Sequence, residues 1–289
     1  MLRLCCGLGA LVVLGCGDIT AIERTDEDPS GKSTRTLTAG GLERSFVYYA
    51  PPSLEPTVPA PVVIVIHGFL MSGEQMFDVT QYHLIADREG FVVLYPDGEP
   101  DAPGPWNVGE GACPSGLGDL PVAAGDDQAF IDAMLDFVEG ERSIDRARVF
   151  VTGFSMGGYF SNETGCLRPD IAAIAAHSGG SHDLADCPVT RKPVIVFHGS
   201  DDGLIPVSCG EQTRARWAER NGCGTEVDVV SVLGGTCEYS KDCPSGGQVA
   251  FCSFEEMAHA WAGGQGIFGA SDYESASELG WSFFEEHAW

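Results

Sequence analysis

The sequence predicts an α/β protein, a single domain built on a doubly wound, mainly parallel sheet. Three observations support this prediction. Apolar runs alternate with helical patterns from Leu37 onward, as expected of successive βα units. The run Val62–Ile66 is entirely β-branched, which is typical of a strand buried on both faces. A glycine-rich turn around Ser155 joins a strand-like segment to a helical one, as parallel βα units require.

The individual elements follow from local patterns. Asp126 and Asp127 precede apolar residues that recur at helical spacing up to Val138, so we expect a helix to start there. A second helix should follow Ser155, and an amphipathic one should cover 273–284. The expected strands cover residues 45–50, 62–66, 91–95, 148–152, 171–176, 194–197, 227–232 and 248–254.

Length and charge narrow the class of protein. A chain of 289 residues suits one α/β domain. It carries 42 acidic and 16 basic residues, a net charge of −26. Such a surface repels nucleic acid and anionic membranes, so we expect neither as a partner. The charge itself is interpreted as a solvated acidic shell.

The N-terminus has the features of an export signal. Residues 1–16 combine Arg3 with a short apolar stretch that ends in Leu14-Gly15-Cys16. This ending resembles a bacterial lipobox, in which Cys16 would be lipidated and provide the only membrane contact; a plain cleaved signal peptide is the alternative. Residues 17–36 are expected to form a flexible acidic tether, and residues 37–289 the folded domain.

Cysteine usage predicts disulfides. Three of the eleven cysteines lie in the leader, so eight remain for the folded domain. An even number in an exported chain favours disulfides, whereas zinc is disfavoured because no CxxC pair occurs. The pairing stays open, although two local bridges among Cys223, Cys237, Cys243 and Cys252 are a reasonable guess.

The segment Gly153-Phe154-Ser155-Met156-Gly157 carries the strongest chemical signal. A GxSxG turn between a strand and a helix is the nucleophile elbow of the α/β-hydrolase fold. Its glycines leave room for neighbouring backbone, and its serine projects beyond the sheet. The alternative is a packing turn with an idle serine.

A serine hydroxyl needs a base to take its proton and an acid to orient that base. In this fold the chain order is Ser, then Asp or Glu, then His. His259 is the histidine that fits this order, because it follows the last expected strand. His67 is expected to form structural hydrogen bonds instead. Asp201 and Asp202 both follow the strand that ends at 197, and spacing alone does not choose between them.

Several motifs in one order resemble the bacterial esterase family that includes polyhydroxybutyrate depolymerase-like and feruloyl or acetylxylan esterases. The resemblance extends from Arg44 to Phe284. Its motifs are Ile66-His67-Gly68, Tyr95-Pro96-Asp97-Gly98, Trp106-Asn107, Asp126-Asp127, Ile144-Asp145, the serine turn, His198-Gly199 with Asp202, Arg216-Trp217-Ala218, and His259 with Trp261. The departure is Ala258-His259-Ala260-Trp261-Ala262, which lacks the family's usual leading Gly and its Pro and leaves the pocket shape open.

The resemblance implies specific roles. It selects Asp202 as the acid and assigns Trp261 and Trp106 to substrate binding. The oxyanion hole would use the backbone N–H groups of Met156 and Phe69. The resemblance implies a serine carboxylic ester hydrolase that needs no cofactor or metal. Together with the export signal, it predicts a secreted protein, extracellular or anchored to the cell envelope.

Feruloyl or acetyl esters of polysaccharide, or polyhydroxyalkanoate, are the expected substrates, with a preference for aryl or acetyl esters because no separate polymer-binding domain follows. A serine peptidase of the same fold and a catalytically idle, polysaccharide-binding lipoprotein are the alternatives.

Overall fold

The computed structural model describes residues 31–99, 104–109, 113 and 125–287. The predicted leader, the lipobox with Cys16 and the first part of the predicted tether lie outside these residues. In the part of the chain that is described, no helix has the length and apolar character needed to cross a bilayer.

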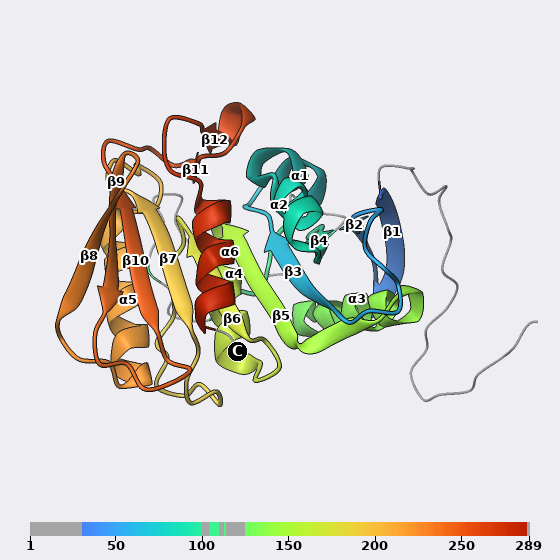
Figure 1. The fold of residues 1–289 in the computed structure, drawn as a ribbon, viewed down its shortest axis with the longest axis horizontal. Helices are drawn as coiled ribbons and strands as arrows, with labels where there is room; N and C mark the ends of the chain where they lie inside the picture. The colour runs from blue at the N-terminus through green and yellow to red at the C-terminus, as the bar shows by residue number, and fades with distance from the viewer. Residues whose placement is uncertain (1–30, 100–103, 110–112, 114–124, 288–289) are drawn as a thin grey trace, which may run out of the picture.

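Ten strands form one twisted sheet in the order β1-β2-β4-β3-β5-β6-β7-β10-β9-β8 (Figure 1). The strands from β4 to β10 pair in parallel, and the pairs at both ends of the sheet are antiparallel. The predicted mainly parallel α/β sheet is therefore confirmed. The strands are Lys32–Ala39 (β1), Leu42–Tyr49 (β2), Ala60–Ile66 (β3), Val92–Pro96 (β4), Ile144–Phe154 (β5), Ala173–His177 (β6), Val194–Gly199 (β7), Val227–Val232 (β8), Gly235–Ser240 (β9) and Val249–Phe254 (β10). Trp261–Ala262 (β11) and Gly269–Ala270 (β12) form a separate small parallel pair.

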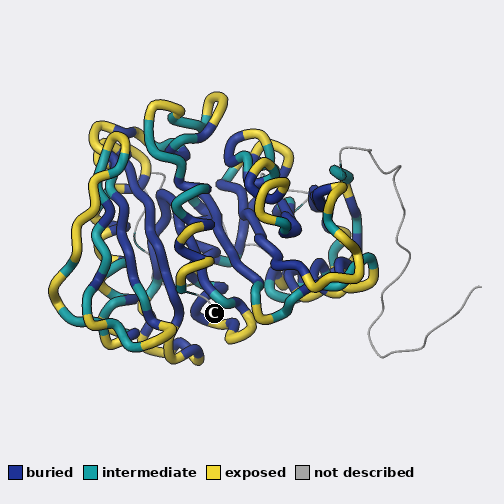
Figure 2. The backbone as a smooth tube through the Cα atoms, in the orientation of Figure 1, coloured by how far each residue is buried: buried dark blue, intermediate teal, exposed yellow. Residues whose placement is uncertain are grey.

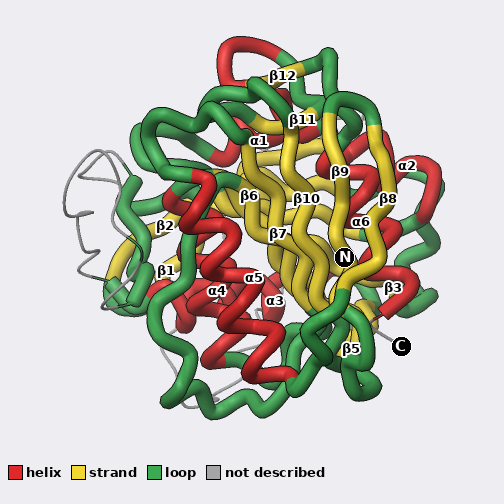
Figure 3. The backbone as a smooth tube through the Cα atoms, turned by 90° about the vertical axis from the view of Figure 1, so that its left-hand side faces the viewer, coloured by secondary structure: helices red, strands yellow, loops and turns green. Residues whose placement is uncertain are grey.

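Helices cover both faces of the large sheet, as Figure 3 shows. One apolar core lies under α3, α4 and α5 and includes Phe130, Phe160 and Trp217. The other lies under α1, α2 and α6 and includes Met76 and Phe284. The helices are Gly73–Thr80 (α1), Tyr82–Glu89 (α2), Asp127–Glu141 (α3), Met156–Leu167 (α4), Val207–Asn221 (α5) and Ala276–His287 (α6). This is the doubly wound arrangement that the alternating sequence pattern predicts.

The central strands are the most deeply buried part of the molecule (Figure 2). Every residue of β3 is buried, and Val62 to Ile66 are fully excluded from solvent. Burying a valine or isoleucine side chain contributes about 1.5–3 kcal/mol. The carboxyl ends of these strands are thus rigid supports for the loops that follow them.

Two strands at the margins of the sheet depart from the sequence expectations. β1 begins at Lys32, inside the segment 17–36 that was expected to be a tether. β9 was not predicted. Buried residues are interspersed with more exposed ones in both strands, and large apolar side chains are few, so their sequences lack the continuous apolar run that marks the central strands. The last helix starts at Ala276 because the Ser275 hydroxyl accepts the Glu278 N–H at 3.3 Å, which caps its first turn.

The eight cysteines of the domain form four disulfides, which confirms the predicted disulfide chemistry. The pairs are Cys113–Cys209, Cys166–Cys187, Cys223–Cys243 and Cys237–Cys252. The last four cysteines therefore pair among themselves, as guessed from their proximity in sequence.

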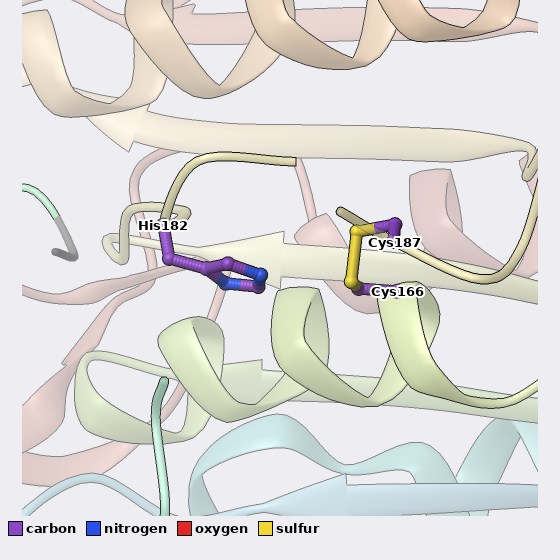
Figure 4. A group of neighbouring side chains, drawn as sticks. All are labelled: Cys166, His182 and Cys187. Carbon is purple, nitrogen blue, oxygen red and sulfur yellow. A yellow bond between two sulfur atoms is a disulfide. The ribbon is translucent and has the colours of Figure 1, made fainter. Parts of the chain in front are cut away.

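His182 lies near one of these disulfides, but the cluster has no thiolate to offer a metal ion. Figure 4 shows the Cys166 and Cys187 sulfurs bonded to each other. The His182 Nδ1 atom lies 3.0 Å from the Glu163 carboxylate. The group is therefore a disulfide beside a histidine–carboxylate contact.

Candidate active site

Ser155 occupies the sharp turn between β5 and α4. Its backbone angles are φ 56° and ψ −118°, a left-handed conformation that is unusual for a residue with a side chain. Such a conformation costs on the order of 1–3 kcal/mol and persists only where the surroundings enforce it. Here the Ser155 N–H donates to the carbonyl oxygen of His177 at 2.9 Å.

The glycines of the turn are required by close backbone contacts. A Cβ atom at Gly153 would lie 2.3 Å from the Gly157 carbonyl oxygen. A Cβ atom at Gly157 would lie 2.3 Å from the carbonyl oxygen of Ile66, at the end of β3. The GxSxG spacing therefore lets α4 pack directly against the strand ends and leaves Ser155 partly exposed.

The structure brings Asp202, not Asp201, to His259. The Asp202 Oδ2 atom lies 2.7 Å from the His259 Nδ1 atom. The other carboxylate oxygen accepts the N–H groups of Leu204 and Ile205 at 2.9 and 2.8 Å. Asp201 is exposed on the same turn, and its N–H donates to the Met257 carbonyl oxygen.

The environment of Asp202 favours the ionised carboxylate. Burial alone would raise the pKa of Asp202, but hydrogen bonds from His198 and His259, the charge of His259 and the Ile205 N–H outweigh it. Together they hold the pKa of this carboxyl well below its ordinary value. Asp202 is therefore an anion that fixes the His259 ring with Nδ1 as the donor.

His259 lies on the loop after β10, next to the serine turn. Its ring centroid is 4.8 Å from that of Phe154, the residue before Ser155. Because Nδ1 contacts Asp202, the Nε2 atom is available to a reacting group. Among the described residues no hydrogen bond joins Ser155 to His259. Such contacts are often long before substrate binds.

The loop after β3 lies against the serine. A Cβ atom at Gly68 would be 3.1 Å from the Ser155 Cβ atom, so the Gly68-Phe69 backbone is adjacent to the reacting position. The first N–H groups of a helix have no intrahelical acceptor, and Met156 is the first residue of α4. The predicted oxyanion donors are the N–H groups of Phe69, the residue after Gly68, and of Met156, the residue after Ser155, and their role stays a prediction.

His67 fixes the shape of that loop. Its Nε2 atom accepts the Gly98 N–H at 2.8 Å, so its protonated Nδ1 donates to the Gly68 carbonyl oxygen at 2.7 Å. Burial lowers the pKa of His67 to about 4, against a smaller opposing effect of the Gly68 hydrogen bond. His67 is therefore neutral near pH 7 and makes the structural hydrogen bonds expected of it.

The two predicted substrate-binding tryptophans are buried. Trp106 is 1% exposed, and its Nε1–H donates to the His67 carbonyl oxygen at 3.1 Å. Trp261 is fully buried, and its Nε1–H donates to the Ser277 hydroxyl at 3.1 Å. In this structure both indole rings are packed in the core and both N–H groups are bonded within the protein, and their assignment to substrate binding stays a prediction.

Two further histidines border the site and were not assigned a role from sequence. The ring of His198 lies close to Asp202: its Nε2 atom is 3.5 Å from the Asp202 carboxylate and 2.9 Å from the Ile205 carbonyl oxygen. His177 ends β6 and contacts both the serine turn and the loop that carries His259. The sequence signal that could have found them is their position, since each histidine directly follows the apolar run of a central strand.

A strained serine turn at the carboxyl edge of a parallel sheet, with an Asp–His pair on the following loops, defines a hydrolase-like site on the α/β-hydrolase fold. Residues 44–209, more than half of the chain, match the family model described as Esterase PHB depolymerase. The chain belongs to this family.

Curated relatives include feruloyl esterases. Feruloyl esterase B of Piromyces equi is 27% identical over 254 residues, which is 78% of this chain and 42% of that protein. Feruloyl esterase C of Emericella nidulans is 27% identical over 224 residues, 73% of this chain and 75% of that protein. The chain spans 42% and 26% of the length of the first two relatives, the second being a bifunctional acetylxylan esterase/xylanase of Neocallimastix patriciarum.

Solved structures share the fold. An acetyl xylan esterase from Aspergillus awamori superposes with a TM-score of 0.64 at 17% identity, over 92% of this chain and 99% of that one. A CE1 ferulic acid esterase from Anaeromyces mucronatus superposes with a TM-score of 0.57 at 14% identity, over 89% of this chain and 90% of that one. At these identities the likeness establishes the α/β-hydrolase fold.

Proposed function

We propose that this protein is a serine carboxylic ester hydrolase in which Ser155 is the nucleophile, His259 the general base and Asp202 the orienting acid. The observation that carries the proposal is the 2.7 Å contact between Asp202 and His259 Nδ1, made beside the strained serine turn. A buried, hydrogen-bonded carboxylate on Nδ1 leaves Nε2 free to take a proton. No cofactor or metal enters this chemistry.

The reaction would follow an acyl-enzyme route. His259 Nε2 takes the Ser155 proton while Oγ attacks the ester carbonyl carbon, and the alcohol leaves with that proton. Water then attacks the acyl-serine with the same base, and the carboxylic acid is released. Asp202 remains ionised throughout and stabilises the imidazolium that forms in each half-reaction.

The developing oxyanion would be bound by two backbone N–H groups, those of Phe69 and Met156. The first is held by a loop that His67 fixes through Gly68 and Gly98. The second lies at the N-terminus of α4, where the helix dipole favours negative charge. Preorganised donors of this kind each contribute roughly 10²–10³-fold to turnover.

Acetyl or feruloyl esters of polysaccharide are the substrates we propose. Feruloyl esterases and an acetylxylan esterase/xylanase among the relatives support this class. Polyhydroxyalkanoate is the second candidate, because the family model is described as an esterase of polyhydroxybutyrate depolymerase type.

We also propose that the protein is exported and acts outside the cell or on the cell envelope, held there if Cys16 is lipidated. Four disulfides support this location, because such bonds persist in oxidising compartments. The acidic surface suits neutral carbohydrate esters better than anionic ligands.

Hydrolysis of p-nitrophenyl acetate, methyl ferulate and a polyhydroxybutyrate suspension tests the proposal. The Ser155→Ala variant should lose at least about 10⁴-fold in kcat, and Ser33→Ala, which removes a hydroxyl from the distant strand β1, should match the unmodified protein. The preferred ester identifies the substrate class. A folded Ser155→Ala variant with most of its activity, or cleavage of peptides with no ester cleaved, would contradict the assignment.

A further inference from the structure

His177 contacts both halves of the candidate site. It is the last residue of β6 and is fully buried. Its backbone carbonyl oxygen accepts the Ser155 N–H at 2.9 Å. Its ring Nε2 atom accepts the Ala262 N–H at 3.0 Å, three residues after His259. One residue therefore joins the serine turn to the loop that carries the proposed base.

The hydrogen bonds define the protonation state of the His177 ring. Because Nε2 accepts a hydrogen bond from the Ala262 N–H, the ring hydrogen sits on Nδ1, which donates to the Ser178 hydroxyl at 3.1 Å. Burial lowers the pKa of His177 far below its ordinary value, and the neighbouring His198 and His259 lower it further, against an opposing effect of Asp202. The ring is thus a neutral acceptor that does not compete with His259 for the serine proton.

The His259 loop is anchored on both sides of the histidine. Before it, the Met257 carbonyl oxygen accepts the Asp201 N–H at 3.1 Å. After it, Ala262 is bonded to His177, and the Trp261 ring stacks on the His177 ring with centroids 4.8 Å apart. Ala262 is fully buried, so its N–H has no access to water as an alternative partner.

We propose that His177 is a positioning residue for ester hydrolysis: its Nε2 acceptor holds the His259 loop in register with the Ser155 turn. This inference rests on the proposed function. His177 touches no reacting atom, and its effect acts through the placement of His259. Misplacement of a catalytic group by about 1 Å costs on the order of 10²-fold in turnover, so a single hydrogen bond at this point has a large effect.

Two variants of similar size separate the acceptor from the packing. The Gln side chain in His177→Gln can place its amide oxygen near the position of Nε2, whereas the Leu side chain in His177→Leu fills space but accepts no hydrogen bond. We expect His177→Leu to lower kcat by roughly 10–100-fold with KM for p-nitrophenyl acetate nearly unchanged, and His177→Gln to recover most of that loss. If His177 served only for packing, kcat would fall by the same factor in both variants.

A second measurement needs no substrate. The proton between His259 Nδ1 and Asp202 should give a far-downfield NMR signal in the resting protein, since it lies in a short hydrogen bond to an ionised carboxylate. The signal should persist in His177→Gln and broaden or vanish in His177→Leu. If the protein cleaves no ester, the proposed function fails, while this signal still decides whether His177 positions the loop.

Folding is checked for each variant by circular dichroism and urea unfolding. If His177→Leu does not fold, His177→Asn takes its place, because its shorter amide does not reach Ala262. Unchanged kcat with an intact downfield signal in a folded acceptor-less variant would overturn the proposal. Equal losses in His177→Gln and the acceptor-less variant would also overturn it.

Discussion

Three buried histidines stand at or just beyond the carboxyl ends of parallel strands in the middle of the sheet, and each bonds to backbone of the loops around the site. His67 follows β3 and bonds to Gly68 and Gly98. His177 ends β6 and bonds to Ala262, and His198 in β7 contacts the Ile205 carbonyl oxygen. An imidazole offers a donor and an acceptor on a rigid ring, which suits it to fix loop backbone where no regular structure can.

Acid should weaken the fold through His67. In the unfolded chain a histidine binds a proton near pH 6.5, whereas the pKa of buried His67 is lowered to about 4. Between these values the unfolded state binds more protons, so the stability present above pH 6.5 declines as the pH falls and is lost once it passes about 4. The difference amounts to about 3 kcal/mol.

Urea unfolding of the unmodified protein and of His67→Gln at pH 7, 6, 5 and 4 measures this effect. The variant should be less stable at pH 7, because it loses the imidazole Nδ1–H that donates to the Gly68 carbonyl oxygen. Its free energy of unfolding should fall less steeply with acid, because it lacks the histidine that titrates. Parallel curves for the two proteins would show that His67 is not the group that titrates.

The sequence was sufficient for the residues whose chemistry depends on local pattern. The Ser155 turn and His259 were placed from spacing and chain order, and the resemblance selected Asp202, which is the aspartate that contacts His259. The sequence was insufficient for residues whose role depends on burial. The sequence did not indicate that Trp106 and Trp261 are packed in the core, and His177 gave no sign of its contact with Ala262, 85 residues away.

At the level of elements, the strands at the centre of the sheet could be predicted from local pattern, whereas two strands near its edges could not. The all-apolar strands β3 and β4 were predicted nearly to their ends, because burial on both faces requires an uninterrupted apolar run. The edge strand β1 and, at the other end of the sheet, the hairpin strand β9 carry few large apolar side chains, so their sequences gave no strand prediction although their partners β2 and β8 are adjacent in the chain.

The hairpin β8–β9 is attached to the rest of the sheet through β10, and a disulfide reinforces that junction. Cys237 and Cys252 face each other across β9 and β10, 15 residues apart in sequence. The double variant Cys237→Ala/Cys252→Ala should lose about 3 kcal/mol of unfolding free energy, as expected for a loop of this length, measured by urea denaturation.

The disulfide Cys166–Cys187 is the matched control. It closes a span of 21 residues, and its cysteines belong to the core under α3, α4 and α5, whereas residues on both sides of His259 belong to the other core. Its double alanine variant should lose a similar free energy but keep its turnover at temperatures where the Cys237→Ala/Cys252→Ala variant is already inactivated, since β10 leads directly to His259. Equal thermal inactivation of the two variants would argue against this distinction.

For the molecule as a whole, the net charge of −26 means that acidic groups repel one another in the folded state. Screening shortens the reach of that repulsion from about 30 Å at 0.01 M salt to about 3 Å at 1 M. We therefore expect the melting temperature at pH 8 to rise by a few degrees as NaCl increases. Each kcal/mol gained in unfolding free energy raises the melting temperature by roughly 2–4 °C.

Calorimetry in a salt series checks this prediction. The same series near pH 4.3, the isoelectric point indicated by the sequence, is the internal control, because the net charge is then close to zero and salt should have little effect. A melting temperature that falls with NaCl at pH 8 would mean that attractive ion pairs outweigh the general repulsion.

The order of strands in the sheet also has a consequence for biosynthesis. β10 inserts between β7 and β9, and the proposed base His259 follows it, far behind Ser155 in the chain. While the chain is being made, the serine turn can form before the segment that completes the site has emerged. In the proposed assignment, ester cleavage begins only once β10 has docked, so a partly synthesised chain is not yet an active hydrolase.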